Sequence, residues 1–300
     1  MRITKISVFP PDLIEVRTDA GLAGYGSGSL CQQALRRTPG MVIGRSPFEV
    51  ESIFDELASL GVAAGGLDIA LWDLMGKAMG QPVCRILGKP YRGQVLSCPS
   101  VPDIGHAEQH RIIRVEAPAE LRRAGTRVGL RYTARDTEEA LSLGEKLQDS
   151  CLEFWESPIP GDNPEGYARL RDVLRISLAA GPDIPLDALV KNYVQTGLVD
   201  MAVQDVGVCG LTGLRRLSYF CWLFHVRLAP CCTGAQLGIA AAVHGAACIP
   251  PASNAIAAPP VFVISGGLPE VELTVPSCPG LGVRIERPSC SPSFVLGDGK

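Results

Sequence analysis

Four short apolar stretches recur along the middle of the chain, and each ends at a polar or turn-forming residue. They cover Leu152 to Glu156, Ile176 to Gly181, Val199 to Asp205 and His225 to Pro230. The residues at their exits lie 26, 23 and 26 positions apart and are Glu156, Pro182, Asp205 and Cys231. A strand followed by a helix and two short loops needs about this length. The spacing therefore predicts a (β/α)₈ barrel, in which the chemistry lies at the C-terminal ends of the strands.

The N-terminal third has a different pattern. Residues 1 to 9 alternate apolar and polar side chains, which predicts a strand, and the Asp-x-Gly sequence within 18 to 26 predicts a hairpin turn. Residues 66 to 78 place leucines and a methionine at helical spacing, and Gly80 follows as a C-cap. Asp68 and Asp73 on this helix are interpreted as residues of a solvated face. The change of pattern near residue 92 predicts a domain boundary there.

Composition excludes several classes of partner. The chain has 300 residues, of which 46% are apolar and 20% charged, with a net charge of −3, as expected for a soluble globular protein. Its scattered basic residues give no footprint for nucleic acid, and no run reaches the ~18 apolar residues of a membrane span. Eleven cysteines without a CxxC pair do not suggest a disulfide framework. We expect a cytoplasmic protein that binds neither nucleic acid nor a membrane.

Several sequence blocks carry a family resemblance. The run GLDIALWDLMGKAMGQPVCRILG at 66–88 resembles the signature helix of the mandelate racemase and muconate-lactonizing branch of the enolase superfamily. Further blocks match in the same order, namely TDAGLAGYG at 18–26, EFWESPIPGDNPEGYARLR at 153–171, VDMAVQDVGVCGLTGLRRL at 199–217 and PGLGV at 279–283. Ordered, independent blocks are more specific than a single motif. The resemblance spans nearly the whole chain.

This resemblance implies a fold and a chemistry. The fold is a modified (β/α)₈ barrel over 93–267 with an α+β capping domain, built from 1–92 and closed by a tail at about 268–300. The chemistry is Mg²⁺-assisted abstraction of the proton α to a carboxylate, so the implied substrate is a small carboxylate or sugar acid. Acid-sugar dehydratases are the most similar members. The family also implies a homo-oligomer.

The metal ligands implied by the family are poorly matched. Glu156 aligns with the first glutamate of a Glu-Glu-Pro turn and is the expected Mg²⁺ ligand, although Ser157 replaces the second glutamate. The next ligand should follow a glycine, where this chain has Pro182. Asp183, one position later, is either a replacement ligand or a surface carboxylate. The third ligand, an aspartate about one βα unit before Glu156, has no match.

The family's acid and base groups are also changed. The Lys-x-Lys pair of the second barrel strand has its remnant at 129 to 131, where Arg131 could orient a substrate carboxylate but cannot take its proton. Asp205 matches the aspartate of a His-Asp dyad, and Cys231 stands at the histidine position. Asp205 is a catalytic partner or only a loop cap, and Cys231 is an acid/base thiol or a buried inert one. The four histidines match no base position.

The barrel also lacks chain length. Ser100 to Glu156 spans 56 residues, where the first strand and three strand-helix intervals need roughly 80. About one βα unit is therefore expected to be missing. Two hypotheses remain: an impaired Mg²⁺-dependent enzyme of the acid-sugar dehydratase kind, or a catalytically inactive pseudoenzyme that serves as a binding or structural protein.

Overall fold

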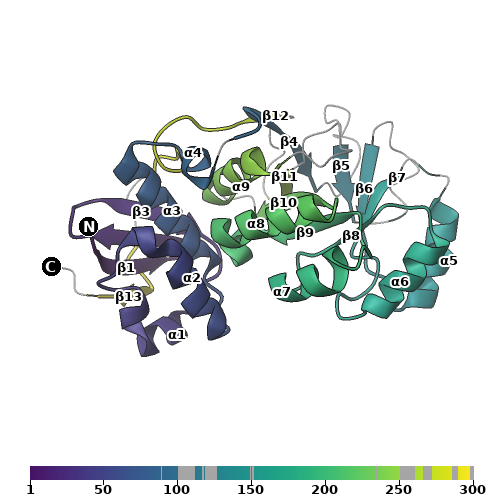
Figure 1. Ribbon diagram of the computed structural model, residues 1–300, viewed down its shortest axis with the longest axis horizontal. Helices are drawn as coiled ribbons and strands as arrows, with labels where there is room; N and C mark the ends of the chain where they lie inside the picture. Colours follow the sequence, from purple (N-terminus) through teal and green to yellow (C-terminus); the bar gives the residue numbers. More distant parts are fainter. Residues whose placement is uncertain are drawn as a thin grey trace.

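The computed structural model forms two sheets. The structure describes residues 1–88, 90–100, 112–116, 118, 127–148, 150, 152–233, 236–250, 261–265, 272–285 and 290–297. Within this part of the chain, one sheet has four strands and the other has nine. The small sheet and the first helices lie at one end of the molecule, and the large sheet lies at the other (Figure 1).

The small sheet is antiparallel and joins both ends of the chain. Its strand order is β13-β1-β2-β3, and these strands are Phe294–Leu296, Ile3–Phe9, Leu13–Thr18 and Ala23–Ser27. The C-terminal strand β13 pairs with β1, so the tail returns to the N-terminal region (Figure 1). The helical segments that follow are α1 (Gln32–Arg37), η1 (Pro39–Met41), η2 (Pro47–Glu49), α2 (Val50–Ser59), α3 (Gly65–Met79) and α4 (Val83–Leu87).

Helix α3 is the predicted signature helix, and it is buried on all sides from Gly65 to Gly76. It ends as predicted, because Gly80 adopts the left-handed conformation with φ of 62°. The interpretation of Asp68 and Asp73 as solvated residues is wrong, since they are only 4% and 3% exposed. Helical spacing locates one apolar face but does not reveal that other elements cover the opposite face as well.

The large sheet contains the predicted strands. Its order is β12-β4-β11-β10-β9-β8-β7-β6-β5, and all neighbours are parallel except β12 with β4. The strands are β4 (Gln94–Pro99), β5 (Ile112–Val115), β6 (Arg127–Arg131), β7 (Leu152–Glu156), β8 (Leu178–Ala180), β9 (Met201–Asp205), β10 (Arg227–Thr233), β11 (Val261–Ser265) and β12 (Glu272–Thr274). Strands β7 to β10 confirm the four predicted strands. Because β10 continues to Thr233, Cys231 lies within a strand and not at its exit.

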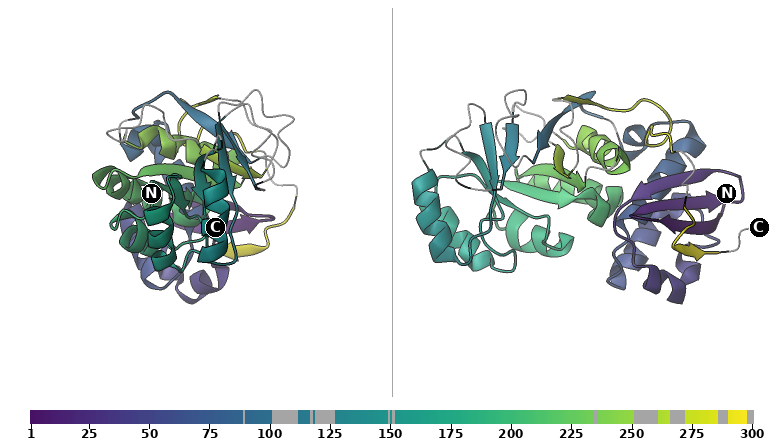
Figure 2. Two further views of the ribbon diagram at one scale, coloured as in Figure 1. Left: turned by 90° about the vertical axis from the view of Figure 1, so that its right-hand side faces the viewer. Right: turned by 180° about the vertical axis from the view of Figure 1, so that it is seen from behind.

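Helices connect the later strands of this sheet. They are α5 (Thr137–Leu147), α6 (Pro164–Val173), α7 (Leu186–Leu189) with the π-helical turn η5 (Val190–Val194), α8 (Val206–Leu223) and α9 (Gln236–Cys248). Figure 2 shows α5 and α6 at the far end of the molecule from the small sheet. In the part of the chain that the structure describes, no helix is long and apolar enough to span a membrane.

The curled sheet returns on itself at β4 and β5. An isolated parallel bridge between Ser100 and Arg114 connects these strands, so eight parallel strands are present among the described residues. The connections on either side of β5 comprise only residues 100–111 and 116–126, whereas residues 157–177 connect β7 to β8. The expected shortage of chain therefore falls on the two connections next to β5, and the strands themselves are retained.

Apolar side chains fill the inside of the barrel. A separate buried cluster there contains Cys98, Phe154, Ala179, Met201, Val203, Ala229 and Cys231. A Cβ atom added to Gly129 would lie 2.0 Å from the Phe154 ring, so this ring occupies the space that a larger residue in β6 would need. The polar groups at the strand ends therefore lie next to an apolar layer.

Candidate site at the C-terminal ends of the barrel strands

A buried ion pair lies at the centre of the barrel. Glu156 ends β7, and side-chain alternation along this strand places Glu156 on the same interior face as Phe154. Arg114 of β5 donates a hydrogen bond from Nη1 to Oε2 of Glu156 at 2.8 Å. Both side chains are 0% exposed. The expected metal ligand therefore already has a cationic partner.

A second arginine extends this pair toward solvent. Arg131 ends β6 in register with Glu156, and its Nε lies 3.6 Å from Oε1 of that carboxylate. Its Nη2 lies 3.8 Å from Oδ2 of Asp183. The exposed fractions of the Arg131 and Asp183 side chains are 26% and 80%. Arg114, Glu156, Arg131 and Asp183 thus form a row of alternating charges from the interior to the surface, which we call the charge row.

The electrostatics of the charge row follow from burial. Removal from water raises the pKa of Glu156, while the guanidinium groups of Arg114 and Arg131 oppose that rise. Burial by itself would lower the pKa of Arg114, but the Glu156 carboxylate raises it above its ordinary value. Arginine is protonated at any physiological pH. The inner end of the row is a permanent cation beside a carboxylate that it neutralises.

Arg114 was missed by the sequence analysis, and its neighbour was assigned to the wrong strand. Counting from β4, Arg114 lies on the second parallel strand, whereas residues 129 to 131 lie on the third. The proposed Lys-x-Lys remnant at 129 to 131 is therefore wrong, because the short connections next to β5 break the regular spacing used to count strands. The available signal was a single arginine in the apolar run from Ile112 to Val115.

The residues present do not fit Mg²⁺. This ion prefers near-octahedral coordination by oxygen atoms, commonly from one or more carboxylates. Around Glu156 the structure places two guanidinium groups, and Asp183 lies on the far side of Arg131. Within the described ranges, no three His, Cys, Asp or Glu side chains are grouped closely enough to hold a metal ion. Glu156 and Asp183 belong to one charge row but do not form a metal centre.

Asp205 and Cys231 occupy adjacent positions on neighbouring strands. Asp205 is the N-cap of α8, where its Oδ1 accepts a hydrogen bond from the Gly207 amide at 2.7 Å. Burial raises the pKa of Asp205, and this hydrogen bond opposes the rise. Cys231 is 0% exposed, and burial raises the pKa of its thiol well above the ordinary value. Cys231 is consequently a neutral thiol, and Asp205 is engaged in capping a helix.

The described histidines do not supply a base at this site. His244 lies in α9, where its Nδ1 accepts from the Cys84 amide at 3.2 Å and its Nε2 is 3.3 Å from the Leu281 carbonyl oxygen. Burial lowers its pKa to about 4, which agrees with a structural histidine. His225 precedes β10 and therefore lies at the N-terminal end of the strand. His106 and His110 lie outside the described residues.

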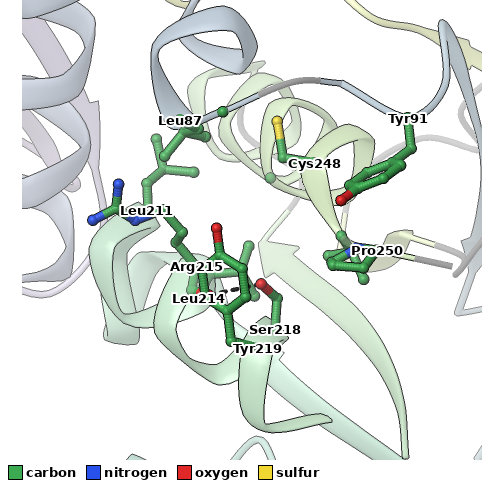
Figure 3. A pocket seen from close by; sticks show the side chains of 12 residues that line it. Leu87, Tyr91, Leu211, Leu214, Arg215, Ser218, Tyr219, Cys248 and Pro250 are labelled. Atoms are coloured by element: carbon green, nitrogen blue, oxygen red, sulfur yellow. Dashed lines mark hydrogen bonds between the residues drawn. The ribbon is translucent and has the colours of Figure 1, made fainter. Parts of the chain in front are cut away.

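A surface hollow lies apart from the charge row (Figure 3). It is bordered by α8, by the end of α9 and by the segment after α4. Tyr219 and Tyr91 lie on opposite sides of it, and Arg215 projects from α8 (Figure 3). None of its lining residues belongs to the charge row. The hollow and the strand ends are therefore separate features.

Comparisons with known proteins agree with this architecture. The family model described as "Mandelate racemase / muconate lactonizing enzyme, N-terminal domain" matches residues 4–88, and "Enolase C-terminal domain-like" matches residues 110–289. A D-galactarolactone cycloisomerase of Agrobacterium fabrum is 24% identical over 92% of this chain and 89% of its own length. A D-galactonate dehydratase of Pectobacterium atrosepticum is 26% identical over 81% of this chain and 78% of its own.

Solved structures share the fold at lower identity. The 3,6-anhydro-D-galactonate cycloisomerase of Zobellia galactanivorans superposes with a TM-score of 0.78 at 20% identity, covering 95% of each chain. An enolase of the mandelate racemase subgroup from Agrobacterium tumefaciens gives a TM-score of 0.79 at 19% identity, also over 95% of each chain. The chain belongs to the mandelate racemase and muconate-lactonizing branch of the enolase superfamily.

Proposed function

We propose that this protein is a pseudoenzyme of the enolase superfamily, which binds small carboxylates of the sugar-acid class without abstracting their α-proton. The Arg114–Glu156 pair carries this proposal, because it places a fixed guanidinium against the carboxylate expected to bind Mg²⁺. The named relatives act on galactonate, galactarolactone and anhydrogalactonate. The substrate class is therefore taken from the family, and the loss of turnover is inferred from the charge row.

The missing chemistry can be stated specifically. Abstraction of an α-proton from a carboxylate requires a base and a stabiliser for the developing negative charge. Arg114 and Arg131 cannot accept a proton, and the buried Cys231 thiol is not ionised. Asp205 caps α8 through the Gly207 amide, and Cys231 stands where the histidine of the His-Asp dyad would be. Among the described residues, these positions supply neither the base nor the divalent cation that the family reaction requires.

Arg131 is the residue that we assign to carboxylate binding. Its guanidinium is partly exposed, and its contacts with Glu156 and Asp183, at 3.6 and 3.8 Å, are longer than hydrogen bonds. A guanidinium presents paired donors that match the two oxygens of a carboxylate. Asp183 is largely exposed and can move aside at little cost. A bound sugar acid would then replace Asp183 as the outer partner of Arg131.

Metal binding provides the first test. Isothermal titration of Mg²⁺ and Mn²⁺ into chelator-treated protein should give no binding heat at millimolar metal, and the melting temperature should not rise with metal concentration. A Glu156→Gln variant is the matched control. Binding by the wild type that this variant abolishes would contradict the proposal, because it would show that Glu156 still ligates a metal.

Carboxylate binding provides the second test. Galactonate should bind the wild type in a calorimetric titration, without formation of a 2-keto acid. Arg131→Ala should weaken this binding by roughly tenfold or more, the effect of losing a charge-assisted pair of hydrogen bonds. Arg169→Ala is the control, because Arg169 is an exposed arginine on α6 that pairs with Glu138. Equal binding by both variants, or product formation by the wild type, would refute this assignment.

A further inference from the structure

The surroundings of Glu156 explain why it needs a cation. Its carboxylate is 0% exposed and lies above the apolar cluster that includes Phe154 and Ala179. An isolated charge in such a place is strongly unfavourable, so it must be neutralised or paired. Arg131 does not meet this need alone, because its Nε is 3.6 Å away and its side chain is partly in water. Arg114 does meet it, with a buried hydrogen bond at 2.8 Å.

We propose that Arg114 is a built-in structural cation, and that the barrel centre is a guanidinium-binding site whose ligand is supplied by the chain itself. This inference rests on the same ion pair as the proposed function, but it assigns that pair a role of its own. The buried Glu156 carboxylate still needs a positive charge beside it. A covalently attached guanidinium meets this requirement, and the protein needs no metal ion to be stable.

Two local features allow an arginine to reach this place. Ala179 is the register neighbour of Glu156 on β8 and has a small side chain. Strand β5 also pairs with a neighbour on each side, and on β6 the register neighbour of Arg114 is Gly129. The connections on both sides of β5 are short, and Arg114 is joined to Ser100 by the bridge between β5 and β4. The guanidinium is thus placed by backbone pairing on both sides of its strand.

A competing interpretation is that the pair is incidental and that either residue could be lost independently. Buried ion pairs often contribute little net stability compared with apolar residues, whereas removal of one partner is costly. The two interpretations therefore differ in the coupling between Arg114 and Glu156, and not in the effect of one substitution. A double-mutant cycle measures that coupling.

The cycle compares the wild type with Arg114→Met, Glu156→Gln and the double variant by thermal unfolding. Arg114→Met should lower the melting temperature by on the order of 5 to 10 °C, because it leaves a buried carboxylate without its main cation. The double variant should recover most of that loss. If the two single losses simply add in the double variant, the inference is wrong. Should Arg114→Met fail to fold, the double variant must still fold, and its failure to do so would also refute the inference.

A chemical rescue tests the identity of the site's ligand. Arg114→Ala should gain thermal stability from millimolar guanidinium chloride, while equal concentrations of sodium chloride or urea should have no such effect. The same additions to Arg114→Ala/Glu156→Gln give the control, because without the carboxylate guanidinium has no partner. A gain no larger in the single variant than in the double variant would refute a guanidinium site.

The two proposals can fail separately. Magnesium binding by the wild type would refute the proposed function whatever the cycle shows. An additive cycle with no magnesium binding would refute only the structural-cation inference. The cycle and the rescue are stability measurements on the full chain, so neither depends on finding a substrate.

Discussion

Two regions of the molecule bury a carboxylate, and they neutralise it by different means. At the barrel centre, Glu156 faces the full charges of Arg114 and Arg131. At the contact between α3 and α8, Asp68 faces uncharged donors instead, and its Oδ2 accepts a hydrogen bond from the Thr212 amide at 2.9 Å. Burial raises the pKa of Asp68 to about 7, because the Thr212 hydroxyl and the amides of Thr212 and Leu211 oppose desolvation only in part. The arginines stay charged at any physiological pH, so the Glu156 carboxylate always has a cationic partner. The Asp68 carboxylate instead changes its protonation state near pH 7.

The geometry around Asp68 shows why that contact is specific. Helix α8 is interrupted at Gly210, which has a φ of 67°, and Thr212 lies in the first turn after the break. A Cβ atom added to Gly210 would lie 2.5 Å from Oδ2 of Asp68, so the carboxylate occupies the space that glycine leaves free. Asp68, a residue of α3, therefore caps the second segment of α8, the helix that follows β9 of the large sheet.

The largest expected effect concerns the barrel centre. Glu156→Leu should reduce the free energy of unfolding by about 3 to 5 kcal/mol, because it leaves the buried Arg114 guanidinium without its carboxylate. Urea denaturation measures this loss. Glu138→Leu is the matched control, since Glu138 is an exposed glutamate in a surface pair with Arg169 and should change stability by less than about 1 kcal/mol. Equal losses in the two variants would remove the distinction between a buried and a surface pair.

The next effect concerns pH and Asp68. Its folded-state pKa of about 7 is above the value of an exposed aspartate, so the folded state holds an extra proton between these two values. The contribution of Asp68 to stability is therefore complete below about pH 4 and falls as pH rises through 7, by at most about 4 kcal/mol. Asp68→Asn should remove this slope. Urea unfolding of both proteins across this pH range tests the prediction, and parallel stability curves would contradict it.

The smallest of the three effects concerns Asp73, a second buried carboxylate of α3. Its oxygens accept hydrogen bonds from the amides of Tyr25 and Leu281, each at 2.8 Å, and from Nζ of Lys77 at 2.5 Å. Asp73→Ala should cost about 2 kcal/mol, because it leaves buried donors without an acceptor. Asp55→Ala provides a control at an exposed ion pair with Arg216. A loss no larger than that of the control would show that these amides find other partners.

The interior of the barrel could be anticipated from the sequence only in part. Glu156 was located correctly because it ends a short apolar run before a proline. In a barrel such a run is a strand, and its last residue lies at the C-terminal end. Arg114 was not located, although it lies on a similar run, because its partner is 42 positions away. Nothing in the local pattern distinguishes an arginine whose side chain points into a barrel from one whose side chain points outward.

The sequence by itself determined the repeating βα units, the signature helix with its glycine end, the replacement of a family metal ligand at Pro182 and the replacement of the family's catalytic histidine at Cys231. These are local properties, set by hydrophobic period, turn residues and residue chemistry. Only the tertiary structure decided that Arg114 neutralises Glu156 and that Asp68 is buried. Pairing of charges and exclusion of water depend on strands and helices that are distant in sequence, so no local pattern encodes them.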